Sequence, residues 1–421
     1  MNEPPQTDLP THEGPPTVAI VLSGAAARGA FQAGALAELL PTLAREGMEP
    51  TIVLGTSAGS INAALWGSMI QLGPRRAADQ LVDTWSRMSH ANVFEPLLCS
   101  SWQTAAQFAR GALFACGGGT TSLLDTDPLR RTAAATLDAA QLHANVETGR
   151  LTAVGLVATR VPPAAAATAG TSSGRSVLFL DEHEPSGYTG DPDRAQDVAR
   201  GPLRAEHVIA SSAIPMAFPA QHVDEPPDAA GWYVDGGIRL NTPVRPAIAL
   251  GADRVVVISA TSTRYGAPLA PDPAADVPDL ADAGAQAMHA VLADRMIEDL
   301  LAVRRTNRML AQVAGAGPHA APVLRRADGT PYRTIHLMTV SPLPGELARL
   351  ASDVAARTTS GLGALRETDN WLLDRALRGA GDASGRRELL SYLLFDETYF
   401  TESIRLGRAA ARRALAAGWE V

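Results

Sequence analysis

Residues 55–59 read GTSAG and form a G-x-S-x-G pattern with Ser57 at its centre. The pattern follows a short apolar run and precedes helical spacing, which is the strand-to-helix context in which a serine is presented as a nucleophile. Gly55 and Gly59 have no side chain, so the strand and the helix can approach each other without a clash. We interpret Ser57 as a candidate nucleophile. A glycine-rich turn that carries an incidental serine is the alternative.

A serine nucleophile also needs donors that stabilise the oxyanion formed on the substrate. Residues 24–29 (GAAARG) lie between an expected strand and an expected helix, so their backbone N–H groups point outward beside a helix N-terminus. The candidate oxyanion loop is made of Gly24, Ala25, Ala26, Ala27 and Arg28, and Gly29 follows it. A dinucleotide-binding loop is the competing interpretation, but Ala26 replaces the middle glycine of that fingerprint.

Asp235 is a candidate for the base that accepts the serine proton. It ends a strand-like run within residues 232–237 (WYVDGG) and is followed by Gly236 and Gly237. If Asp235 faces Ser57, burial would raise its pKa and make it a better proton acceptor at neutral pH. A turn-forming Asp-Gly pair is the alternative interpretation of the same residues.

The elements that must position these residues follow from the apolar pattern. Residues 17–22 and 51–54 read as buried strands, and helical spacing begins at Gly29 and again at Ser57. This order of strand, helix, strand and helix predicts an α/β fold with a parallel sheet. Further strands are expected at residues 151–159, 176–180, 254–259 and 334–340.

The chain organisation favours one large domain, because the last expected strand lies beyond residue 330. We expect a disordered lead-in over residues 1–16 and a single domain over residues 17–421. Segments rich in Pro, Gly, Ala and Asp predict surface loops near residues 162–174, 181–202 and 266–278. Helical patterns are expected at residues 280–313 and 362–417, the second as a C-terminal extension.

Composition excludes several classes of protein. The 421 residues contain no lysine, so Schiff-base enzymes, Walker P-loops and Ser-Lys dyads are ruled out. A net charge of -8 argues against nucleic-acid binding, and two cysteines are too few for a disulfide framework. The N-terminus lacks the features of a signal peptide, and no apolar stretch is long enough to span a membrane. We therefore expect a cytoplasmic protein, with at most peripheral membrane contact.

Together, the loop, the GTSAG elbow and the DGG segment resemble the patatin-like phospholipase family in order and spacing. Residues 210–215 (ASSAIP), 241–243 (NTP) and 250–253 (LGAD) also look like that family. The resemblance implies a three-layer α/β/α fold and a Ser-Asp dyad, with Ser57 as nucleophile, Asp235 as base and the backbone of residues 24–28 as oxyanion hole. It also implies a lipid acyl hydrolase that forms an acyl-enzyme on phospholipid or another fatty-acyl ester, at a membrane or micelle, without metal or cofactor.

The chain departs from the family pattern at Ala25 and Ala26, where the family has glycines. Alanine keeps the N–H donor but resists positive φ, at a cost of about 1 kcal/mol. Three alternatives stay open: a non-catalytic binding or scaffold protein with this fold, an esterase of small soluble esters, and an α/β-hydrolase triad that adds His336. The apolar residues 94–114 are interpreted as a buried helix or as a lid over the acyl site.

Overall fold

The computed structural model describes residues 16–88, 127–162, 174–215, 218–263, 280–315, 324–325, 331–358 and 383–421. Several expectations fall outside these ranges. They are the lead-in at residues 1–15, nearly all of the loops at 162–174 and 266–278, the apolar segment at 94–114, and the first part of the helical region at 362–417.

A nine-stranded sheet runs through the described part of the chain. Its strands are β1 (Val18–Leu22), β2 (Pro50–Thr56), β3 (Ala153–Arg160), β4 (Arg175–Glu182), β5 (Gln196–Arg200), β6 (Gln221–Val223), β7 (Gly231–Asp235), β8 (Arg254–Ile258) and β9 (His336–Val340). The main order is β5-β4-β3-β2-β1-β8-β9, and β7 pairs with both β3 and β6. Strands β3, β2, β1, β8 and β9 are parallel, so their carboxyl ends meet at one edge.

The burial of the central strands explains why the apolar pattern located them. Every residue of β1 (VAIVL) is buried, because a parallel sheet is covered by helices on both faces. The expected strands near 17–22, 51–54, 151–159, 176–180, 254–259 and 334–340 are confirmed. Residues 181–202 are not a continuous loop, because β5 (QDVAR) lies within them. This edge strand is mostly polar and only partly buried, so it lacks the apolar run used to find the others.

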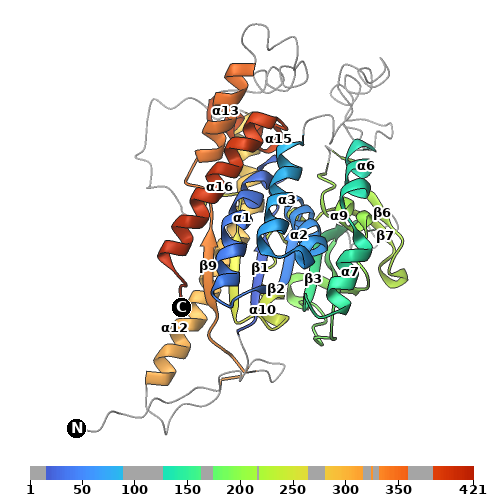
Figure 1. Ribbon diagram of the computed structural model, residues 1–421, viewed down its shortest axis with the longest axis vertical. Helices are drawn as coiled ribbons and strands as arrows, with labels where there is room; N and C mark the ends of the chain where they lie inside the picture. Colours follow the sequence, from blue (N-terminus) through green and yellow to red (C-terminus); the bar gives the residue numbers. More distant parts are fainter. Residues whose placement is uncertain are drawn as a thin grey trace, which may run out of the picture.

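Helices cover both faces of the sheet and complete three layers (Figure 1). One face is packed by α1 (Gly29–Arg45), α2 (Ala58–Met69), α3 (Pro74–Ser86), α7 (Ala139–Glu147), α13 (Glu346–Thr358) and α16 (Glu397–Ala417). The other face carries α10 (Val244–Ala249) and α12 (Arg295–Gly315). The remaining helices used below are α6 (Asp127–Thr136), α9 (Ala205–Ser211), α11 (Leu280–His289) and α15 (Ala383–Leu393), with short turns η1 (Ala26–Arg28) and η5 (Gly236–Ile238). The α/β/α prediction is confirmed.

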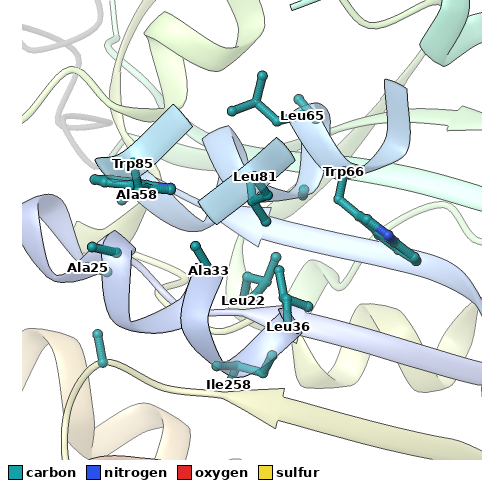
Figure 2. Close-up of a cluster of buried hydrophobic side chains, with 14 of the residues drawn as sticks. Leu22, Ala25, Ala33, Leu36, Ala58, Leu65, Trp66, Leu81, Trp85 and Ile258 are labelled. Carbon is teal, nitrogen blue, oxygen red and sulfur yellow. The ribbon is translucent and has the colours of Figure 1, made fainter. Parts of the chain in front are cut away.

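The C-terminal helices pack directly onto the first helix of the domain. Glycines allow this contact: a Cβ added at Gly407 of α16 would lie 2.0 Å from the carbonyl oxygen of Phe31 in α1, and one at Gly34 would lie 2.1 Å from that of Ile404. Figure 2 shows the layer beneath α1, where Leu36 lies near Leu22 of β1 and Ile258 of β8. Helix α1 is thus held between the sheet and the C-terminal region.

Candidate active site

Ser57 lies in the sharp turn between β2 and α2 with φ 56° and ψ -129°, a conformation that L residues rarely adopt. The turn is possible because its neighbours are glycines. A Cβ at Gly59 would lie 2.4 Å from the carbonyl oxygen of Leu22, and one at Gly55 would lie 2.3 Å from that of Gly59. Strain of this kind persists only where the surroundings enforce it, and it clusters at functional sites.

A buried serine, Ser211 at the end of α9, fixes the elbow from behind. Its hydroxyl oxygen accepts a hydrogen bond from the Ser57 N–H at 3.0 Å and lies 2.6 Å from the Ser60 hydroxyl. It donates in turn to the carbonyl of Val157 in β3. Residues 210–215 carry part of the family resemblance, and the structure shows that Ser211 ties this segment to the turn.

Asp235 ends β7, which runs antiparallel to β3 with Asp235 opposite Ala158. Its backbone N–H donates to Ala213 at 2.8 Å, and its carboxylate accepts from the Gly237 N–H at 2.7 Å. Burial raises the pKa of Asp235 from 3.8 to about 6, although hydrogen bonds from Ser57 and Gly237 act in the opposite direction. The sheet therefore brings together two residues 178 positions apart, each only 5% exposed.

The loop of residues 24–28 lies against Ser57, because a Cβ on Gly24 would be 3.3 Å from Cβ of Ser57. The Gly24 N–H donates to the Asn241 carbonyl at 3.1 Å, and the Arg28 N–H donates to the Ala25 carbonyl at 3.0 Å. Within the part of the chain that the structure describes, the N–H groups of Ala25, Ala26 and Ala27 have no acceptor. These three N–H groups are therefore the candidate oxyanion donors, rather than the five of the whole loop.

The two alanines that replace family glycines differ in conformation. Ala26 has φ 46°, in the left-handed region, whereas Ala25 has φ -147° and is extended. The expected cost of alanine at positive φ therefore applies to Ala26 alone.

A buried polar network beneath the loop was not found from the sequence. Gln32 donates to the carbonyl of Ser23 at 2.8 Å, and Asn62 donates to Gln32 at 3.0 Å and to the carbonyl of Gly29 at 3.1 Å. The Trp85 indole N–H then donates to Asn62 at 2.6 Å. These side chains tie the ends of β1, α1, α2 and α3 together, and no short motif marks them.

An apolar cavity adjoins Ser57. Among the described residues its lining is Ala26, Ser57, Ala58, Ile61, Trp85, Met88, Leu129, Ser212, Ile214, Phe218 and Phe395. A second apolar cavity shares Ile61, Met88, Leu129 and Ser212 with it and extends between α2, α6 and α9. The walls contain almost no charge and suit a hydrocarbon chain.

His336 lies far from this site. It begins β9 opposite Arg254 of β8, and Arg254 in turn lies opposite Val18, at the start of the parallel strands. Ser57 follows β2 at the carboxyl ends of those strands, beside the pairing of Leu22 with Gly55. A triad of Ser57, Asp235 and His336 is therefore wrong, because the histidine lies at the opposite edge of the sheet.

The described residues show neither a cluster of metal ligands nor a helix that could cross a membrane. No group of three or more His, Cys, Asp or Glu side chains there is placed to hold a metal ion. None of the described helices is long and apolar enough to cross a membrane.

Comparisons with known proteins were made for the sequence and for the fold. No curated protein matches. VipD from Legionella pneumophila matches at 10% identity with a TM-score of 0.31, covering 96% of this chain and 67% of that protein. Human GIVD cytosolic phospholipase A2, in complex with methyl gamma-linolenyl fluorophosphonate, matches at 16% identity with a TM-score of 0.39, covering 95% of this chain and 60% of that one.

The family comparison is more specific. The model for patatin-like phospholipase matches residues 20–248, which is more than half of the chain and contains Ser57, Asp235 and the loop at residues 24–28. The chain therefore belongs to the patatin-like phospholipase family.

Proposed function

We propose that this chain is a lipid acyl hydrolase that cleaves carboxylic esters with a dyad of Ser57 and Asp235. One observation carries the proposal: a buried carboxylate has a raised pKa, and the Ser57 side chain, which is held in a strained turn, is close enough to lower that pKa in part. Such a pairing of nucleophile and base is the requirement for covalent catalysis. Among the described residues no histidine is hydrogen-bonded to Ser57, so Asp235 is the base in this mechanism.

The reaction proceeds in two halves. Asp235, with a pKa of about 6, is mostly ionised at pH 7 and accepts the hydroxyl proton as Ser57 Oγ attacks the ester carbonyl. The N–H groups of Ala25, Ala26 and Ala27 stabilise the oxyanion. The intermediate collapses when the C–O bond of the ester breaks, and protonated Asp235 gives its proton to the leaving alkoxide. The acyl-enzyme remains on Ser57. Water then attacks the acyl carbonyl, with Asp235 accepting its proton. The bond to Ser57 Oγ breaks as Asp235 returns that proton to the serine oxygen, and the fatty acid leaves.

The substrate class follows from the family and from the cavity beside Ser57. A hydrocarbon chain in this cavity would contact the apolar side chains of Ile61, Met88, Leu129 and Phe395. We propose a glycerophospholipid, or a related fatty-acyl ester, as the substrate. Binding would take place at a membrane or micelle surface, where such lipids are found.

The test compares fatty-acid release from phosphatidylcholine vesicles with hydrolysis of a short-chain nitrophenyl ester. We expect the wild type to act on both and Ser57→Ala to act on neither, with His336→Ala unchanged as the control. Hydrolysis of the short ester alone would favour an esterase of small soluble esters. No hydrolysis by the wild type would favour a non-catalytic protein with this fold.

A further inference from the structure

Arg28 ends the oxyanion loop, but its side chain is bound to the C-terminal helix α15. The guanidinium is 3% exposed, and Nε donates to Ser391 at 3.0 Å. One terminal nitrogen donates to Tyr392 at 3.0 Å and to the carbonyl of Ala260 at 3.2 Å. The other donates to Glu388 at 2.6 Å and to Ser391. A guanidinium has five N–H donors, and these contacts use all five.

The acceptors are themselves held in place. The Tyr392 ring lies 3.8 Å from the guanidinium carbon, and its hydroxyl lies 3.1 Å from that of Thr261. The Ser391 hydroxyl donates to the carbonyl of Glu388 at 2.5 Å. Tyr399 of α16 donates to the carbonyl of Ser391 at 2.9 Å. The end of β8, α15 and α16 thus form one polar network around Arg28.

This network fixes one end of the segment that carries the candidate oxyanion donors. Arg28 closes the turn η1 through its N–H bond to Ala25, while the N–H bond of Gly24 to Asn241 fixes the other end. Between them, Ala26 is held at φ 46°. A strained residue keeps its conformation only while its surroundings enforce it. Release of Arg28 would therefore let the donors at residues 25–27 move.

We propose that Glu388, Ser391 and Tyr392 are positioning residues for the oxyanion loop, that they act through Arg28, and that Arg28 does not bind the substrate head group. This inference rests on the proposed function. It makes α15, which lies outside the family match at residues 20–248, part of the catalytic unit. Because oxyanion donors act on the transition state, their displacement lowers kcat and leaves KM unchanged.

The experiment measures kcat and KM for Arg28→Lys, Glu388→Gln and Tyr392→Phe. The substrates are a neutral short-chain ester and phosphatidylglycerol in mixed micelles, and active sites are counted by fluorophosphonate labelling. We expect Arg28→Lys and Glu388→Gln to lower kcat about 10- to 100-fold on both substrates, with KM within about twofold of the wild type. The double variant of Arg28→Lys and Glu388→Gln should lose no more kcat than the worse of the two single variants, because both changes release the same loop. The control is Glu402→Gln, which removes an exposed ion pair with Arg405 on α16 and should leave kcat unchanged.

Two results would overturn the inference. A rise in KM for phosphatidylglycerol alone, with the neutral ester unaffected, would mean that Arg28 meets the head group. A lower melting temperature with wild-type kcat, measured well below that temperature, would mean that α15 contributes stability only. A wild-type protein that neither turns over nor is labelled would refute the proposed function and this inference with it.

Discussion

The catalytic edge of the sheet and the C-terminal helices support the site in different ways. At the edge, Ser57 and the loop at residues 24–28 are placed by short segments whose glycines allow close backbone approach. In the C-terminal region, α15 supplies side chains that hold Arg28, and α16 packs closely on α1 at Gly407, each from more than 350 residues away. The reacting groups thus lie in turns at the sheet edge, while the side chains that hold Arg28 of the oxyanion loop come from the far end of the sequence. A change at the edge should affect chemistry first, and a change in the C-terminal region should affect stability or loop geometry.

Among changes at the catalytic edge and in the C-terminal region, we expect the largest effect on activity at Asp235, which lies at the edge. Asp235→Asn keeps the side-chain shape but removes the base, so kcat should fall by about 10²- to 10⁴-fold. In the wild type, kcat/KM should fall as pH drops through about 6, because only the ionised carboxylate accepts a proton. The measurement is a pH–rate profile between pH 4.5 and 9. A profile without an inflection between about pH 5 and 7 would argue against this base.

The same substitution should increase stability. Burial raises the pKa of Asp235 above its ordinary value of 3.8, so the folded state favours the protonated form. The stability that the protonated Asp235 gives the folded state is fully present below pH 3.8 and is lost as pH rises through about 6. Asparagine carries no charge, so at pH 8 Asp235→Asn should be more stable by up to about 3 kcal/mol, and the gain should shrink at pH 5. Urea unfolding at both pH values tests this. An equal change at the two would contradict it.

A change at the contact between α1 and α16 should instead lower the stability of the protein. Gly407→Ala places a Cβ where only 2.0 Å separates it from the Phe31 carbonyl oxygen, so the helices must move apart. We expect a loss of about 1–3 kcal/mol in the free energy of unfolding. Gly67→Ala in α2 is the matched control, because a Cβ there would meet only ordinary contacts at 3.6 Å. Equal stability of the two variants would mean that the helix contact is not tight.

We expect the smallest effects, which are on stability and of opposite sign, for glycine substitutions at Ala25 and Ala26 of the oxyanion loop. Ala26→Gly relieves a positive φ and should stabilise the protein by about 1 kcal/mol. Ala25→Gly relieves nothing, since φ is -147°, and should destabilise it by about 0.5–1 kcal/mol because glycine loses more entropy on folding. Denaturant unfolding of both variants checks the sign. The same sign in both would show that the loop conformation differs from the one described.

The sequence predicted those parts of the molecule that short continuous segments of the chain specify. The strands around Ser57 are continuous apolar runs, and the elbow and the DGG segment are short motifs, so Ser57, Asp235 and the loop at residues 24–28 could be named as candidates. Four features had no such signal. The edge strand β5 is polar, and the contrast between Ala25 and Ala26 is one of backbone conformation. The buried network of Gln32, Asn62 and Trp85 has no motif, and the partners of Arg28 in α15 lie about 360 residues away without one.

The most direct test of the central claim is peptide mapping after reaction with a fluorophosphonate. The proposed mechanism predicts one adduct, on the peptide that contains Ser57, formed at a rate that falls with pH below about 6. Ser57→Ala should form none. Ser212→Ala, a change at a buried serine that lines the same cavity, should react as the wild type does. An adduct on another serine, or no adduct on the folded wild-type protein, would contradict the assignment of Ser57 as the nucleophile.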